Sequence, residues 1–271
     1  MDAGLGIVVA LAALLVADMI EGGSPAAFAN LSALMIILGG TFGATIASAG
    51  LAQFKAFPKL FTLALKPRVS EMAATSDRLV HFAERARREG LLALESDVDQ
   101  VEDPFLRRGL QMVIDGLEPE TVEEVLETEI EATQARHGKG IAMFAQMGGF
   151  APTMGVIGTV MGLVNVLSHL DDPSNLGRSI AVAFIATLIG VGTANIAWLP
   201  ISNNLKRKDA EEAAERRMVL AAILAIQAGD NPRIVARKLQ AHARPVAAAP
   251  ATSSSSASAP TAAPGAAEEA A

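Results

Sequence analysis

The chain has 271 residues and a net charge of −7, and 51% of its residues are hydrophobic, with a mean hydropathy of +0.36. This composition is too apolar for an ordinary soluble domain, and the negative charge argues against a nucleic-acid partner. The chain contains no cysteine, which excludes disulfides, thiolate nucleophiles and cysteine metal sites.

Four apolar stretches predict membrane-spanning helices. They run from Gly4 to Ile20, from Leu31 to Ala49, from Met143 to Leu170 and from Ser179 to Ile201. A helix crosses a bilayer with about 18 or more apolar residues. The late pair meets this requirement easily, because residues 140–170 and 179–205 carry no formal charge. No Lys or Arg precedes the first stretch, which argues against a secretory leader.

The distribution of positive charge predicts the orientation of the spans. The short link 21–30 has no Lys or Arg, and the link 171–178 has one Arg against two Asp. Basic residues flank the opposite ends of the stretches: Lys55, Lys59, Lys66, Arg68, Arg136, Lys139, Lys206, Arg207 and Lys208. Because Lys and Arg accumulate on the cytoplasmic side, we predict an inner-membrane protein with both termini and the large loop in the cytoplasm.

The large loop, residues 52–142, is predicted to be helical. Apolar residues at helical spacing lead to a break at Gly90, and Pro104 suits the first turn of a helix that ends near Gly116. Pro119 then opens a long acidic helix that continues into the third span.

The segment after the fourth span is predicted to continue as a polar helix to Gln227, and Asn231-Pro232 is typical of the start of a last short helix. We therefore predict an all-α membrane protein. Its segments are 1–51 with two spans, 52–142 as a cytoplasmic helical loop, 143–201 with two further spans, 202–241 as cytoplasmic helices and 242–271 as a disordered Ala/Pro/Ser-rich tail.

The late spans contain polar residues but no ionisable side chain. Thr159 and Thr187 fall near mid-membrane, where a hydroxyl either bonds to its own helix or offers oxygen to a cation or water. Asn165 adds polarity toward the outer end. Pro152 frees a backbone carbonyl and predicts either a plain kink or a functional hinge. If this chain moves ions, the titrating group must come from a partner.

Other patterns indicate packing rather than chemistry. Gly39 with Gly43, and Gly158 with Gly162, are small-xxx-small pairs that let helices approach closely. Trp198 lies near the end of the fourth stretch, where an interfacial residue would sit. The four histidines form no metal-ligand pattern, and no nucleophile, base and orienting group can be assembled, so an enzyme is disfavoured.

Three motifs carry a resemblance to a known family. They are Ala-Arg-Arg-Glu-Gly-Leu-Leu-Ala-Leu-Glu at 86–95, Ala-Pro-Thr-Met-Gly-Val-Ile-Gly-Thr at 151–159 and Ile-Leu-Ala-Ile-Gln-Ala-Gly-Asp-Asn-Pro at 223–232. With the four-span layout, they resemble the MotA/PomA family of flagellar motor stator subunits, and the PomA branch most closely. The likeness covers nearly everything up to about residue 240.

The resemblance implies a homopentamer around two copies of a MotB/PomB-type partner. That partner's single helix brings the ion-binding Asp, and only the partner reaches peptidoglycan. Ion flow would turn the pentamer, whose loops push a switch-complex protein of the rotor. No cofactor is implied beyond the transported Na+ or H+.

The resemblance also assigns roles to single residues, although composition alone makes the loop charges a solvated face. The rotor-facing residues would be Arg87, Arg88 and Glu95. The residues that couple ion flow to torque would be Pro152 and Pro200. The ion path would include Thr159, Thr187, Pro152 and Asn165, with Thr159 as a transient Na+ contact.

The ion itself is left between Na+ and H+, with Na+ favoured. Sodium-type relatives have threonine at the position of Thr159, but Asn30 replaces a PomA-like Asp, and Ser96 replaces an acidic residue beside Glu95. One alternative is an ExbB/TolQ-like proton-channel energiser, although such relatives typically have three spans after a periplasmic N-terminus. A membrane adaptor without ion conduction is a second alternative.

Overall fold

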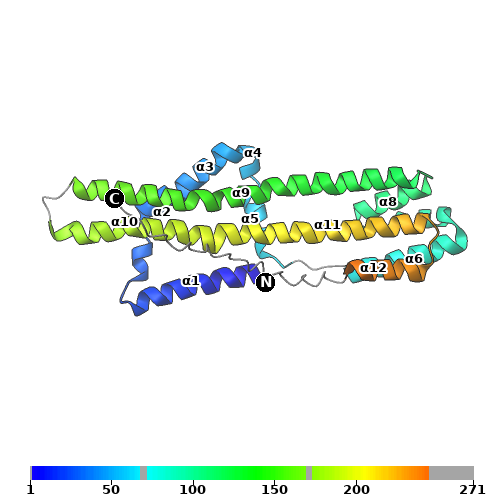
Figure 1. Ribbon diagram of the computed structural model, residues 1–271, viewed down its shortest axis with the longest axis horizontal. Helices are drawn as coiled ribbons and strands as arrows, with labels where there is room; N and C mark the ends of the chain where they lie inside the picture. The colour runs from blue at the N-terminus through cyan, green and yellow to red at the C-terminus, as the bar shows by residue number, and fades with distance from the viewer. Residues whose placement is uncertain (1, 68–71, 169–172, 244–271) are drawn as a thin grey trace, which may run out of the picture.

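The structure is a computed structural model that describes residues 2–67, 72–168 and 173–243, and this part of the chain is folded as helices and their connections (Figure 1). The elements are α1 (Asp2–Ile20), η1 (Pro25–Phe28), α2 (Leu31–Leu34), η2 (Met35–Gly39), α3 (Gly40–Ala49), α4 (Leu51–Phe54), α5 (Phe57–Leu65), α6 (Met72–Glu89), η3 (Leu91–Leu94), α7 (Glu95–Val98), α8 (Pro104–Ile114), α9 (Pro119–Leu167), α10 (Pro173–Thr193), η4 (Ala194–Trp198), α11 (Leu199–Gln227) and α12 (Pro232–Ala243).

Two long antiparallel rods form the axis of the molecule (Figure 1). The first rod is α9, whose 49 residues extend about 70 Å at 1.5 Å per residue. The second rod is α10, η4 and α11, which follow one another without a break. Because a bilayer core is about 30 Å thick, both rods are long enough to project well beyond it.

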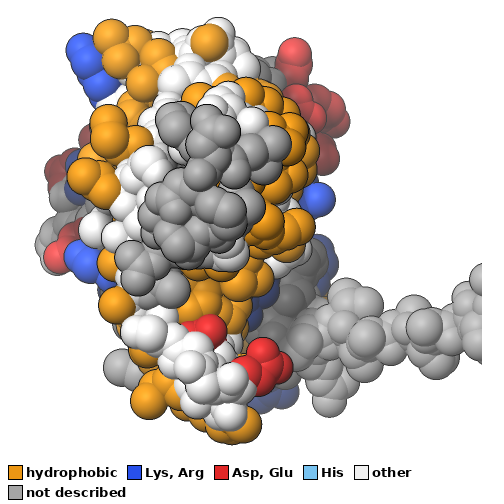
Figure 2. All heavy atoms as spheres, turned by 90° about the vertical axis from the view of Figure 1, so that its left-hand side faces the viewer, with side chains coloured by type: hydrophobic (Ala, Val, Ile, Leu, Met, Phe, Trp, Pro, Cys, Tyr) orange, Lys and Arg blue, Asp and Glu red, His pale blue; other side chains and the backbone are white. Residues whose placement is uncertain are grey.

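Within the described residues, three helices are long and apolar enough to cross a membrane: Leu31–Ala49, Pro119–Leu167 and Ile180–Gln227. The apolar helix Gly4–Ile20 falls short of that length. The second predicted span is confirmed as a helix, with a π-turn at η2. Seen from the end of the molecule at the left of Figure 1, hydrophobic side chains form broad bands on the surface (Figure 2).

The first helices pack on the outside of the rods. α3 lies against α9, whereas α1 contacts η1, η4, α5 and α11 and leaves many apolar side chains exposed. Asn30 begins α2, because its Oδ1 accepts a hydrogen bond from the Ala33 N–H at 3.2 Å. The residue that replaces a PomA-like Asp is thus the cap of this helix.

Trp198 is buried within an aromatic cluster, with 7% of its surface exposed. Its ring centroid lies 6.1 Å from that of Phe42 on α3 and 6.2 Å from that of Phe57 on α5. Phe57 in turn packs on Phe144 of α9 at 5.4 Å. The cluster joins α3, α5, α9 and η4, so the prediction of an interfacial tryptophan gives way to a core role.

A second hydrophobic core lies at the other end of the rods. Here α6, α8 and α12 gather around α9 and α11 (Figure 1). Its fully buried side chains include Leu79, Leu110, Leu126, Ile130 and Ile223. This core holds the end of α6 and the start of α7, which carry Arg87, Arg88 and Glu95, at the end of the rods opposite to Leu167.

Local sequence signals explain where these helices begin and end. Gly90 follows α6 and has a φ angle of +88°, and Gly116 lies two residues after α8 and has a φ angle of +79°. Glycine adopts such positive φ angles readily, so each helix ends there. Asp103 caps the start of α8, because its Oδ1 accepts a hydrogen bond from the Phe105 N–H at 3.0 Å. Asn231 precedes α12 in the same way, and its Oδ1 accepts from the Arg233 N–H at 3.0 Å. The predicted starts and the predicted end at Gln227 are confirmed. The tail was predicted to start at residue 242, but α12 continues to Ala243. The rest of the predicted tail lies outside the described residues.

Candidate functional site

The helices α9 and α10 touch backbone to backbone. A Cβ at Gly190 would lie 2.6 Å from the Ala151 carbonyl oxygen and 3.0 Å from the Gly155 Cα. Farther along, a Cβ at Gly158 would lie 3.0 Å from the Ala186 Cβ, and one at Gly162 would lie 2.7 Å from the Ala183 Cβ. The predicted packing role of the Gly158–Gly162 pair is therefore confirmed. In contrast, nothing lies within 4 Å of a Cβ at Gly39 or Gly43.

This close approach brings Thr159 and Thr187 together. The Thr159 hydroxyl lies 3.0 Å from the Ala183 carbonyl oxygen on α10 and 3.1 Å from the Gly155 carbonyl oxygen on its own helix. It also makes a short contact with the Thr187 hydroxyl, which lies 3.4 Å from the same Gly155 carbonyl. Two hydroxyls and two carbonyls thus form a cluster of oxygen atoms between two helices.

The number of hydroxyl protons limits how many hydrogen bonds this oxygen cluster can donate. Each hydroxyl has one proton and two lone pairs. Thr159 and Thr187 therefore donate two hydrogen bonds at most, and they retain lone pairs that can accept a proton or face a cation. The Thr159 hydroxyl bonds to a carbonyl of its own helix, which is one of the two alternatives from the sequence, whereas the Thr187 hydroxyl contacts a carbonyl of the other rod. Contact of either hydroxyl with an ion or water stays a prediction.

Pro152 and Pro200 lie on the two rods beside a shared contact. Pro152 removes the N–H that would bond to the Gly148 carbonyl, and Pro200 does the same for Ile196. A Cβ at Gly148 would lie 2.5 Å from Leu199 Cδ2, so the residue before Pro200 packs onto the turn that Pro152 interrupts. The π-turn η4 directly precedes Pro200. The proline of α9 and the π-turn of the second rod therefore lie close to the same contact.

Asn165 is exposed on α9, nearly two turns beyond Thr159 toward the end of the helix at Leu167. The structure therefore places it on the same helix as the oxygen cluster but not within it. Asp171 and Asp172, which follow, lie outside the described residues.

Arg87, Arg88 and Glu95 lie at the opposite end of the molecule from the oxygen cluster, and all three are exposed. Arg87 and Arg88 end α6, and Glu95 begins α7. The sequence did not single out Leu92, which lies between them and is 73% exposed. We define these four residues, Arg87, Arg88, Leu92 and Glu95, as the tip.

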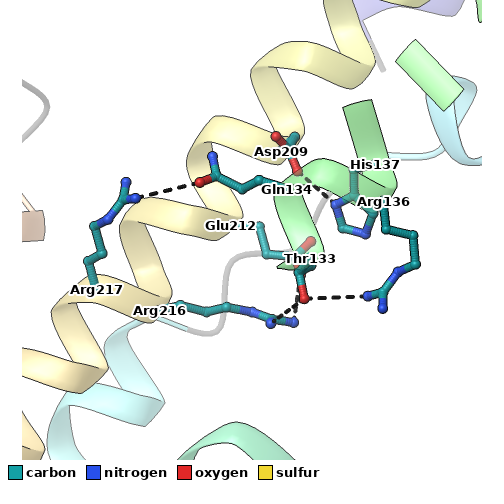
Figure 3. A network of polar contacts seen from close by, with 8 residues as sticks. All are labelled: Thr133, Gln134, Arg136, His137, Asp209, Glu212, Arg216 and Arg217. Carbon is teal, nitrogen blue, oxygen red and sulfur yellow. Dashed lines mark hydrogen bonds and ion pairs between the residues drawn. The ribbon is translucent and has the colours of Figure 1, made fainter. Parts of the chain in front are cut away.

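Polar contacts join the two rods between the oxygen cluster and the tip (Figure 3). His137 Nδ1 and Asp209 Oδ1 lie 2.7 Å apart, and Arg216 Nη2 donates to Glu212 Oε1 at 2.8 Å. The Thr133 hydroxyl lies 3.3 Å from Arg216 Nη1, which donates to it. The His137–Asp209 and Thr133–Arg216 contacts join α9 to α11, which are far apart along the chain, so no local pattern predicts them. The Arg216–Glu212 pair lies within α11, with its members four residues apart.

Lys208 ties α5 to α11. Its ammonium donates to the carbonyl oxygens of Leu63 at 2.6 Å, Ala64 at 3.2 Å and Lys66 at 2.6 Å. These are carbonyls of the last turn of α5, which have no partner within the helix. A residue predicted only as a cytoplasmic-side charge therefore caps a helix that is distant in sequence.

Comparison with known proteins gives consistent results. The sequence model of the MotA/TolQ/ExbB proton channel family matches residues 97–218. Motility protein A of Bacillus subtilis (strain 168) is 38% identical over 239 residues, covering 87% of each chain. Chemotaxis protein PomA of Vibrio alginolyticus is 33% identical over 231 residues, covering 85% of this chain and 90% of PomA.

Two solved structures are similar throughout. The flagellar MotAB stator complex from Bacillus subtilis matches with a TM-score of 0.83 and 36% identity, over 91% of this chain and 97% of that one. The structure of C. jejuni MotAB matches with a TM-score of 0.85 and 31% identity, over 89% and 96% of the two chains. The likeness therefore includes the rods and the helices α6, α8 and α12 that gather around one end of them.

Proposed function

The chain belongs to the motility protein A family of flagellar stator subunits, which form an ion channel with a MotB partner, and from this premise we propose that its Thr159–Thr187 oxygen cluster lines the ion path. The observation that supports this role is the pairing of two hydroxyls with the Gly155 and Ala183 carbonyls inside charge-free spans. The ExbB/TolQ-like alternative shares the family model, but relatives over most of the chain are motility proteins.

The partner completes the channel in this proposal. Residues 140–170 and 179–205 contain no carboxylate, so a single-span MotB-type helix supplies the titrating Asp. Five copies of this chain surround two such helices in the inner membrane, with four spans per copy. Both termini and the 52–142 loop face the cytoplasm, as the basic flanks indicate.

Sodium is the ion that the oxygen cluster favours. A hard cation is bound by several oxygen ligands, and stripping its water is costly. Thr159 and Thr187 offer hydroxyl oxygens, and Pro152 leaves the Gly148 carbonyl without its helix donor. A proton would need only the partner's acid and a chain of water. We therefore assign Na+ as the transported ion.

Movement produced at the ion path would reach the rotor through the rods. Pro152 and Pro200 lie beside the Gly148–Leu199 contact, where each rod has lost a helix hydrogen bond. Beyond this level both rods continue without a break to the cytoplasmic core that carries the tip. The tip contacts a switch-complex protein of the rotor, with Arg87 and Arg88 against acidic groups and Glu95 against basic groups.

The test is the swimming speed of cells in which this chain and its MotB-type partner are the only stator, as external sodium is lowered at fixed pH. A speed that falls with sodium supports a sodium stator. A constant speed would assign the current to protons. Cells that never swim, although the complex assembles in the membrane, would contradict the stator function.

A further inference from the structure

We propose that Arg85 and Asp97 form a positioning pair that sets the angle between the two charged arms of the tip, Arg87–Arg88 on α6 and Glu95 on α7. The pair itself does not contact the rotor. This role rests on the proposed function, because it concerns how the tip is presented to a partner with complementary charges.

The contact between the two arms is direct. Arg85 Nη1 donates to Asp97 Oδ1 and Oδ2, each at 2.5 Å, and Arg85 Nε donates to Glu89 Oε2 at 3.2 Å. One guanidinium therefore joins the last turn of α6 to α7, across the break at Gly90. The side chains of Arg85 and Asp97 are 30% and 23% exposed, which is less than the 54% of Glu89.

Besides this pair, α7 is held by its contacts with η3 and α8. It is a single turn of four residues, and an isolated turn is not stable in water. Leu94 and Val98 bury one side in the cytoplasmic core, with 0% and 1% exposed. These apolar side chains hold α7 against the core, whereas a directional bond is needed to fix its orientation relative to α6. Among the printed contacts of α7, the Arg85–Asp97 pair is the one that reaches α6 through charge.

The helical period explains how the pair acts on Glu95. Residues two apart on an α-helix are about 200° apart around its axis, on nearly opposite sides. Because Asp97 is turned toward Arg85, Glu95 is turned to solvent, where it is exposed. The same spacing separates Arg85 from Arg87, which is also exposed. Loss of the inward pair would free α7 to rotate and carry Glu95 with it.

The electrostatics keep this pair charged. The side-chain hydrogen bond to Asp97, and then that to Glu89, raise the pKa of Arg85 above its ordinary value. Surface ion pairs of this exposure add little to stability. Removing the pair should therefore alter the geometry of the tip and leave the fold intact.

The experiment uses the full complex with its MotB-type partner as the only stator. Asp97→Asn and Arg85→Gln each remove one charge of the ion pair, and the double variant Arg85→Asp/Asp97→Arg restores the pair with reversed charges. Glu129→Gln is the matched control, because it breaks the Arg108–Glu129 pair at 2.6 Å on the same domain, away from the tip. Swimming speed, recruitment of labelled stators to motors, and Tm of the purified complex are measured.

The expected result is that each single variant lowers speed about twofold or more, the double variant recovers most of it, and Glu129→Gln has no effect, with Tm unchanged throughout. When Glu95→Gln is already present, Asp97→Asn should lower the swimming speed little further, because Asp97 acts by positioning the charge of Glu95, which is then absent.

Normal speed in the single variants would overturn the positioning role. The role would also be overturned if Asp97→Asn lowered the swimming speed equally with Glu95 and with Gln at position 95. A loss of speed that accompanies a fall in Tm would overturn it too, because a purely structural pair would produce that result. If the unaltered complex does not support swimming although it assembles, the proposed function fails and this role fails with it.

Discussion

Gly155 on α9 and Gly190 on α10 pack so closely that a Cβ at Gly190 would lie 3.0 Å from the Gly155 Cα. The obstructing atoms belong to the backbone, which cannot move aside as a flexible side chain could. This contact fixes the register of the two helices, and the register brings Thr159 to Thr187.

Gly190→Ala should therefore destabilise the complex by about 1–3 kcal/mol, as overpacking does. The measurement is thermal unfolding of the purified complex. Gly192→Ala is the control on the same helix, because nothing lies within 4 Å of its Cβ position. Replacing glycine within a helix there should be neutral or slightly stabilising. Equal stability of the two variants would contradict the backbone contact.

Thr159→Ala should abolish the sodium dependence of swimming or switch the ion, while assembly survives, because it removes the hydroxyl that joins α9 to α10. Thr159→Ser keeps the oxygen and should retain sodium dependence. Thr193→Ala is the matched control, since the printed bond of that hydroxyl is to Gly190 on its own helix at 3.1 Å. Swimming speed against external sodium distinguishes them. Unchanged dependence in Thr159→Ala would remove this hydroxyl from the ion path.

Reversal of Arg87 and Arg88 to Glu should cut motility and lower stator incorporation at motors, because both side chains are exposed at the tip. Arg237→Glu changes an exposed arginine on α12 and should have little effect. The measurements are swimming speed and motor localisation. If the double reversal left swimming speed and motor localisation normal, these arginines would be solvent-exposed charges without a role in rotor contact.

Leu92→Ser should weaken incorporation at motors while leaving Tm unchanged, because a leucine that is 73% exposed adds little to the fold and is available to a partner. Val125→Ser is a suitable comparison, since Val125 is 42% exposed on α9 in the same domain. Localisation of labelled stators tests this role. A loss in Tm for Leu92→Ser would show that the side chain supports the fold instead.

Lys208→Met should lower the Tm of the complex, because the carbonyls at the end of α5 lose the ammonium group that donates to them. The expected fall is roughly 2–4 °C, which corresponds to the loss of about one net hydrogen bond. Lys206→Met removes an exposed charge two residues away and serves as the control. Thermal unfolding compares the two. Identical Tm values would mean that water replaces the ammonium without cost.

The candidate site was partly predictable. Their position near the middle of charge-free spans, and then the resemblance to the stator family, singled out Thr159 and Thr187, but their contact across α9 and α10 depends on the Gly155–Gly190 register. The Arg85–Asp97 pair had a weak signal, namely opposite charges on either side of the break at Gly90. Lys208 as a cap of α5 had none, because the carbonyls that it caps lie 142 to 145 residues earlier in the chain.

The sequence by itself determined the helices and their ends. Gly90, Pro104, Pro119 and the Asn231-Pro232 pair act through local backbone geometry and capping, which depend on neighbours along the chain. The charge-free stretches likewise identified the candidate spans. These features need no knowledge of how one helix lies against another.

Only the tertiary structure decided which face of each helix is covered. Trp198 lies near the end of an apolar stretch, where an interfacial residue is expected, yet its side chain is buried beside Phe42 and Phe57. Gly158 packs on α10, whereas Gly39 meets nothing within 4 Å, although both belong to the same kind of pair. The rotation of a helix about its axis and its contact partners depend on residues far apart in the chain, and local pattern carries no record of them.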